Sequence, residues 1–188
     1  MIFYFFNIID IKRLISTVCS ALIFAIHFLM YRNGGKDIMD CYEINASTLC
    51  IVPIDKNRSF VYEIEDCFEV NMSSSDIIKR SCLFFGSTFD GRKKFSVDLL
   101  NANYKLPIII EESTQLIFFP TTSNISNNCI WISYNNYEYH EKNDSRTSTI
   151  KFKNGSIVSV DVSIFVLSNQ IIRCNRLKLE FNKRKKAV

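Results

Sequence analysis

The dipeptide Asn154-Gly155 constrains the fold of this chain more tightly than any other local feature of its sequence. Strand-forming residues precede it at 149–152 and follow it at 157–162. Asn and Gly both tolerate the positive φ that a type I′ turn requires, and this turn matches the twist of paired antiparallel strands. The sequence therefore predicts a β-hairpin with a type I′ turn at this point.

The chain from Met39 onward contains further short runs of the same kind. Each run is rich in β-branched and aromatic residues and is bounded by polar turn residues, as the strands of an antiparallel sheet are. These runs lie at 42–54, 59–70, 108–110, 115–119 and 129–133. No repeat and no long low-complexity linker interrupts them, so they predict a single domain.

Two segments have helical rather than strand periodicity. The first begins at the capping residues 74–76, carries an apolar stripe and ends at Gly86. The second follows Ser163, and its apolar positions recur at intervals of three and four: Ile164, Leu167, Ile171, Cys174, Leu177 and Phe181. We therefore predict an α+β fold, mainly an antiparallel β-sheet with a short internal helix and a C-terminal amphipathic helix.

Residues 1–38 differ in character from the rest of the chain. The 18 residues at 14–31 carry no formal charge. As a helix they would span about 27 Å, close to the shortest length that crosses a hydrocarbon core of about 30 Å. This length makes residues 14–31 a possible membrane anchor. The alternative is a mis-assigned start of the chain, because Met39 stands just before the first strand-like run. The predicted parts are an N-terminal extension at 1–38, a domain at 39–181 and a basic tail at 182–188.

The cysteines and histidines exclude several classes of protein. Seven cysteines are an odd number and never form a C-x-x-C pair, which predicts reduced thiols in a cytosolic protein rather than a disulfide framework. The only histidines are His27 and His140, too few for a structural zinc site. We therefore predict no metal and no cofactor.

The sequence also lacks a catalytic constellation. No P-loop, G-x-S-x-G or G-x-G-x-x-G motif occurs. His140 lies in a segment, 135–146, that we predict to be a polar loop, with no buried acid to orient it as a base. Glu111 and Glu112 follow a predicted strand, where adjacent side chains point to opposite faces. The protein is therefore predicted not to be an enzyme, and no catalytic residue is assigned.

Basic side chains are clustered although the formal net charge is only +4. Residues 173–188 hold seven basic side chains and one acidic one. A second basic run lies in the segment 87–94, which we predict to be a turn directly after Gly86. The candidate DNA-binding residues of this turn are Ser87, Thr88, Arg92, Lys93 and Lys94. Hydroxyls and cations of this kind bind phosphate oxygens, but a solvated charged turn is an equal alternative.

Four further residues are secondary candidates for DNA binding. Lys79 and Arg80 lie on the polar face of the predicted internal helix, on either side of Leu83. Asn127 and Asn128 precede the single tryptophan of the chain, and an asparagine can read the acceptors of A·T base pairs. The tryptophan itself is expected in the core.

A series of short motifs runs in a fixed order across residues 42–162. They are Tyr42-Glu43-Ile44-Asn45 with Thr48, Ser81-Cys82-Leu83-Phe84-Phe85-Gly86 followed by Gly91-Arg92-Lys93, Pro107, Phe118-Phe119-Pro120-Thr121 with Ser123, Cys129-Ile130-Trp131-Ile132-Ser133, and Phe152-Lys153-Asn154-Gly155. Each motif is short, but in their order and spacing they resemble the ComK family of competence transcription factors.

The resemblance implies a transcriptional activator that switches on DNA-uptake genes and so establishes competence for transformation in a bacterium. It implies double-stranded DNA as the partner, bound at paired A/T-rich boxes largely through the minor groove and the phosphate backbone. It also implies a homodimer on each box, with two dimers at a site. The narrow minor groove of A/T-rich DNA attracts Arg and Lys. The expected location is the cytoplasm, on the nucleoid.

The chain departs from the family pattern in three respects. Residues 1–38 have no counterpart in the family. The position of Leu83 is commonly Arg there, so one phosphate contact is expected to be missing. The best-known members carry a longer C-terminal tail that an adaptor uses for regulated proteolysis, and adaptor control of this chain is left open.

The alternative function is a membrane-anchored or secreted β-rich binding module without DNA binding. It would be tethered to the membrane through residues 14–31. Six N-x-S/T sequons also favour it: Asn45, Asn57, Asn71, Asn124, Asn143 and Asn154.

Overall fold

The computed structural model describes residues 38–123 and 128–186. The chain divides into two units, Met1–Asp37 and Ile38–Val188, and all described residues belong to the second unit. The segment 14–31, predicted to be either an anchor or untranslated, lies outside the described residues, as does Asn127. In the described ranges none of the helices combines the length and the apolar character that crossing a membrane requires.

Six strands form the larger sheet, and every neighbouring pair in it is antiparallel. They are β1 (Thr48–Pro53), β2 (Ser59–Glu63), β3 (Cys67–Val70), β4 (Ile108–Glu111), β5 (Leu116–Pro120) and β6 (Trp131–Ser133). Their order across the sheet is β3-β2-β1-β6-β5-β4. Each predicted strand region contains a strand, with two differences. Residues 42–47 of the run 42–54 precede β1 and are not in a strand, and the run 59–70 forms two strands instead of one.

A second sheet contains three antiparallel strands in the order β7-β8-β9. They are β7 (Tyr137–Lys142), β8 (Ser148–Phe152) and β9 (Ile157–Val160). The predicted loop at 135–146 is therefore wrong, because its central six residues form β7. All residues of β7 are exposed or only half-buried. A strand in this position needs no apolar face, so its sequence lacks the apolar pattern that would have predicted it.

The predicted hairpin is confirmed as the β8–β9 pair, but its turn type is wrong. Gly155 has φ of 89°, whereas Asn154 does not have positive φ. The N–H of Gly155 donates to the carbonyl of Phe152 at 2.9 Å, and the N–H of Phe152 donates to the carbonyl of Ser156 at 2.9 Å. This pattern is a type I turn followed by a left-handed glycine, the usual three-residue hairpin loop.

Three helices complete the described fold: α2 (Ser74–Phe84), α3 (Phe89–Leu100) and α4 (Ile164–Lys186). The first and last confirm the predicted helices. The helix α3 corrects the prediction of a turn at 87–94. It begins there because Thr88 is its N-cap, with a side chain that accepts a hydrogen bond from the N–H of Gly91 at 3.0 Å. The aspartate Asp90 lies in its first turn, where the helix dipole favours an acid.

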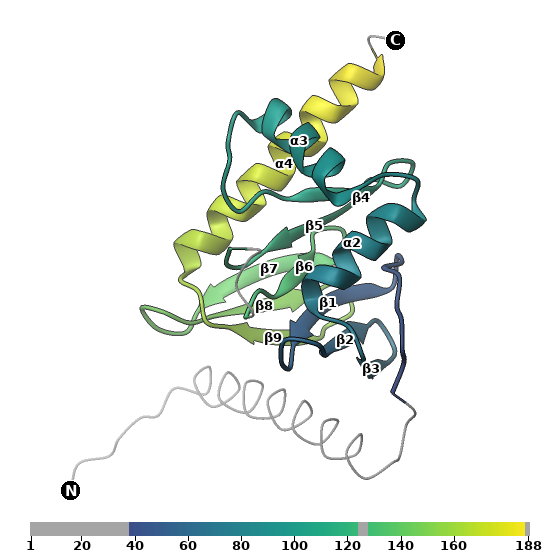
Figure 1. The fold of residues 1–188 in the computed structure, drawn as a ribbon. Coiled ribbons are helices and arrows are strands. Elements are labelled where there is room, and N and C mark those ends of the chain that lie inside the picture. The colour runs from purple at the N-terminus through teal and green to yellow at the C-terminus, as the bar shows by residue number, and fades with distance from the viewer. Residues whose placement is uncertain (1–37, 124–127, 187–188) are drawn as a thin grey trace, which may run out of the picture. The chain divides into compact units, whose positions relative to one another are not determined.

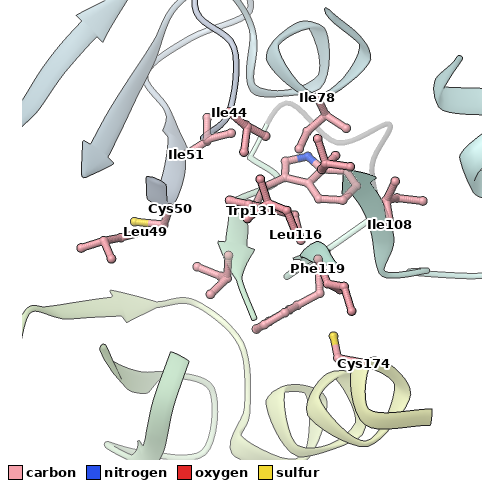
Figure 2. Packing of buried hydrophobic residues seen from close by; sticks show 14 of the residues in the cluster. Ile44, Leu49, Cys50, Ile51, Ile78, Ile108, Leu116, Phe119, Trp131 and Cys174 are labelled. Atoms are coloured by element: carbon pink, nitrogen blue, oxygen red, sulfur yellow. The ribbon is translucent and has the colours of Figure 1, made fainter. Parts of the chain in front are cut away.

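The helices α2 and α4 lie on opposite faces of the six-stranded sheet (Figure 1). Figure 2 shows Ile78 of α2 against Trp131 of β6, while Phe119 of β5 points the other way, toward Cys174 of α4. Trp131 is only 1 % exposed, so it belongs to the core as expected. These two apolar layers hold the helices at fixed positions on the sheet, and α3 packs against α4 at one end of it.

The described cysteines contribute to the same core. All six are free, and all except Cys41 are buried. Burial raises the pKa of the Cys82 thiol to about 11, which keeps it neutral and unreactive. These cysteines therefore serve as small apolar residues, as the sequence predicts.

Candidate nucleic-acid interface

The first residues of α3 fix the geometry of the segment that was predicted to be a basic turn. The Thr88 hydroxyl is used as the helix cap, so it accepts a hydrogen bond from the helix itself. A Cβ at position 91 would lie 3.1 Å from the Thr88 Oγ1 and 3.4 Å from the Ser87 Oγ. Gly91 therefore makes room for the cap, because a larger residue at this position would crowd both hydroxyls.

Arg92 points into the protein. The residue is only 8 % exposed, and its guanidinium forms an ion pair with Glu112 in the β4–β5 turn. Its Nη2 also lies 3.5 Å from the carbonyl oxygen of Phe85. The expectation that Arg92 is a free surface cation is therefore wrong, because the inward stripe of α3 is formed by positions 92, 96 and 99. Its ion pair instead joins α3 to the end of the sheet.

The two glutamates that might have suggested acid/base chemistry both have structural roles. Although partial burial opposes it, hydrogen bonds from Thr114 and Ser113 lower the pKa of Glu111 to about 2. The backbone N–H groups of Ser113 and Thr114 donate to its carboxylate at 2.5 and 2.8 Å. Glu111 thus holds the β4–β5 turn in the shape that presents Glu112 to Arg92.

His140 also has a structural environment. Its Nδ1 lies 2.7 Å from the hydroxyl of Tyr137, and its Nε2 lies 2.9 Å from the hydroxyl of Ser168 in α4. Partial burial lowers its pKa, which favours the neutral ring that these contacts need. In the described part of the chain no group of His, Cys, Asp or Glu side chains could hold a metal ion.

The C-terminal end of α4 packs against α3. The rings of Phe95 and Phe181 meet edge to face with centroids 5.8 Å apart. The guanidinium of Arg184 lies over the Phe95 ring at 5.7 Å and donates to Asp98 at 2.7 Å. The Lys185 amino group donates to the backbone carbonyl of Glu112 at 3.3 Å. The two basic segments, far apart in the sequence, therefore lie together.

This arrangement also corrects the expected tail. The helix α4 continues to Lys186, so residues 182–186 are the last turns of a helix that packs on the domain. The side-chain amide of Gln115 donates to Asn182, which ties this part of α4 to the β4–β5 turn. The basic residues at 183–186 are therefore held in place.

We call this region the basic end. It consists of Lys93, Lys94, Lys183, Arg184, Lys185 and Lys186. Lys183 pairs with Glu180 and Arg184 with Asp98. Among the described residues, the other four lysines form no ion pair, and all of them except the half-buried Lys93 are exposed. In the basic end, aromatic contacts and ion pairs thus hold α3 and α4 together. The four lysines without an ion pair leave it with an excess of positive charge.

The secondary candidates do not join this cluster of spare charge. Lys79 pairs with Asp76 at 3.1 Å, and Arg80 pairs with Glu43 at 2.5 Å. The hydrogen bond and the charge of Glu43 raise the pKa of Arg80. Asn128 is exposed at the start of the segment that leads into β6. Sequence reasoning thus found both basic segments but missed that α3 and α4 unite them.

Comparison with known proteins gives two matches. A family model described as ComK protein matches residues 39–186, which include every described helix and strand. A competence transcription factor from Bacillus subtilis (strain 168) is 31 % identical over 149 residues, which is 78 % of this chain and 78 % of the relative. No solved structure matches the chain.

Proposed function

This chain belongs to the ComK family of competence transcription factors, and from that membership we infer that it activates competence genes by binding double-stranded DNA. It is not an enzyme. The observation that carries the proposal is the extent of the family match, because residues 39–186 include both segments of the basic end.

We propose the basic end as the DNA-binding surface. The unpaired lysines of α3 and α4 would contact phosphate oxygens, and Arg184 and Lys183 would add charge at the rim of the same surface. A cation that folding already holds in place loses little conformational freedom when it neutralises a phosphate, so a rigid base favours binding of this kind. A/T-rich boxes are the expected targets, because their narrow minor groove concentrates negative potential.

The residues predicted from the sequence keep different roles in this proposal. Lys93 and Lys94 remain direct contacts, whereas Arg92 becomes a positioning residue that anchors α3. Lys79 and Arg80 are secondary contacts at most, because each is already paired with an acid. Ser87 and Asn128 also stay secondary contacts. Thr88 is retained as the cap of α3, and Asn127 stays a prediction outside the described residues.

A mobility-shift titration tests the proposal. The full chain is titrated against a duplex with two A/T-rich boxes and against a G·C-rich duplex of equal length, at several salt concentrations. We expect tighter binding to the A/T-rich duplex and a logarithmic salt slope of roughly −4 to −8 for a dimer, at about −0.9 per neutralised phosphate. A flat salt dependence would contradict binding through the basic end.

We also propose that residues 39–186 are sufficient for this activity in the cytoplasm. The N–H of Met39 donates to the backbone carbonyl of Glu69 at 3.1 Å, and the N–H of Asn71 donates to the backbone carbonyl of Met39 at 2.8 Å, so Met39 takes part in the fold. A chain begun at Met39 is expected to bind the A/T-rich duplex as tightly as the full chain. Intact mass of the native protein, with fractionation of membranes, would show whether Met1 is retained. Control by a proteolysis adaptor stays open.

A further inference from the structure

The outward face of α4 carries large apolar side chains that the domain does not cover. Phe165 is 77 % exposed, Ile172 is 62 % exposed and Leu179 is 55 % exposed. They are seven residues apart, or about two helical turns, so they lie in one line along the helix. The face opposite them is the buried one, formed by Leu167, Gln170, Cys174, Leu177 and Phe181. We call the three exposed residues the outer stripe.

The charges of α4 are divided unequally along its length. The half from 164 to 172 contains no charged residue. The half from 173 to 186 contains seven basic residues and one acidic residue. A partner helix that ran parallel would set basic half against basic half, which is unfavourable. A partner that ran antiparallel would set each basic half against an uncharged one, and it would also oppose the two helix dipoles.

We propose that the outer stripe binds a second copy of this chain, with the two α4 helices antiparallel about a two-fold axis at Ile172. In such an isologous contact Ile172 meets its own counterpart. Phe165 then meets Leu179 of the partner, because these two residues are equally far from Ile172. Lys183 falls level with the partner's Asp161, an exposed acid just before α4. The outer stripe can therefore pair with its own copy, and the pairing brings a basic side chain close to an acidic one.

The same geometry spaces the two basic ends along DNA, and this step rests on the proposed function. At about 1.5 Å per residue, Lys183 and its counterpart lie about 33 Å apart along the helix axes. Dimeric DNA-binding proteins commonly contact half-sites about 34 to 36 Å apart, one turn of the duplex. The antiparallel pair therefore offers its two basic ends to neighbouring turns on one side of a duplex.

The contact is small, and this sets where the dimer forms. A helix of 23 residues is about 35 Å long, so a single stripe buries much less than the roughly 1,600 Å² of a standard interface. Free chains are therefore expected to be mainly monomeric at low concentration. An A/T-rich box that binds a homodimer holds two copies side by side and raises their effective concentration.

Disulfide crosslinking tests the arrangement. The full chain is used with Cys19→Ser and Cys41→Ser, because the other cysteines are buried. Ile172→Cys should form a disulfide-linked dimer on mild oxidation with the two-box duplex present. Phe165→Cys alone should not, since its counterpart lies about 21 Å away along the axes. A mixture of Phe165→Cys and Leu179→Cys chains should give the mixed dimer.

The matched control is Lys56→Cys, an exposed position in the β1–β2 turn that should form no dimer. If Ile172→Cys stays monomeric while the chain shifts the duplex, the interface is wrong and the proposed function stands. If the duplex is not shifted at all, the proposed function fails, and crosslinking of Ile172→Cys at high protein concentration decides the interface alone.

Efficient crosslinking of Phe165→Cys to itself would show parallel helices and overturn the proposal. The proposal would also be overturned if the Ile172→Cys thiol of the monomer failed to react with a soluble maleimide. Part of the same chain would then cover the outer stripe.

Discussion

The basic end and the exposed face of α2 both carry cations, but they differ in what those cations contact. On α2, Lys79 and Arg80 are each neutralised by an acid nearby. At the basic end, Lys183 and Arg184 pair with acids. The other four lysines of the basic end form no ion pair with the described residues. The number of basic residues in a segment therefore does not identify a binding surface. What matters is how many stay unpaired once the chain has folded.

The largest expected effect comes from removing the spare charge of the basic end. A variant with four substitutions should bind the A/T-rich duplex about 100-fold more weakly, or less tightly still, at low salt. The substitutions are Lys93→Gln, Lys94→Gln, Lys185→Gln and Lys186→Gln. The salt slope should become shallower by about 0.9 for each phosphate that the variant no longer neutralises. Mobility-shift titration measures both quantities, and circular dichroism checks that α4 is intact. Unchanged affinity in a folded variant would move the DNA surface elsewhere.

The second effect concerns stability. Arg92→Ala removes a buried cation from its ion pair with Glu112 and leaves the anchor of α3 empty. Because Glu112 is half-exposed, the free energy of unfolding should fall by about 1 to 3 kcal/mol, less than for a fully buried pair. Thermal or urea unfolding measures the loss. The neighbouring Lys94→Ala is the control and should stay within about 0.5 kcal/mol of the parent. Equal stability of the two variants would contradict the inward position of Arg92.

A smaller effect concerns the turn that carries Glu112. The pKa of Glu111 is lowered to about 2 from its ordinary 4.5, so the carboxylate stabilises the fold above about pH 4.5 and loses this effect as the pH falls toward 2. Glu111→Gln should therefore be less stable than the parent at pH 7, by under about 1 kcal/mol because water screens so exposed a group. The difference should disappear as the pH falls through about 2. Urea unfolding at several pH values gives the comparison, and a constant difference would exclude the ionised carboxylate as its source.

The smallest effect is expected on α2. Lys79→Ala and Arg80→Ala remove cations that Asp76 and Glu43 already neutralise. Exposed ion pairs contribute little, so both stability and DNA affinity should change by under about 0.5 kcal/mol. A loss of affinity as large as that of the basic-end variant would remove the distinction between the two regions.

Much of the fold could be predicted because local patterns agree with the final structure. The hairpin at Asn154-Gly155 and the helix α4 have strong turn and periodicity signals. The helix α3 could not be predicted so easily, because Gly91 and three successive cations are typical of a turn. Its inward stripe begins with Arg92, a residue that normally marks an exposed face. Polar composition hid β7 in the same way.

The candidate site was predictable only in part. The composition of both basic segments is visible in the sequence. Lys94 is exposed and Lys93 is half-buried, and their role in DNA binding stays a prediction. Their meeting with the end of α4 depends on the contact of Phe95 with Phe181 and on the Arg184–Asp98 bond, which joins residues 86 positions apart. Tertiary contacts over such a separation leave no local signal. For the same reason, the pairing of Arg92 with Glu112 could not be foreseen.

Protection of lysines from acetylation by bound DNA locates the DNA-binding surface without any variant. The full chain is acetylated briefly with and without the two-box A/T-rich duplex, and mass spectrometry measures the modified fraction of each lysine. We predict that DNA protects Lys94, Lys185 and Lys186 strongly, while Lys79 and Lys56 react equally in both samples. Protection of Lys79 with full reactivity at the basic end would contradict the assignment of the DNA-binding surface.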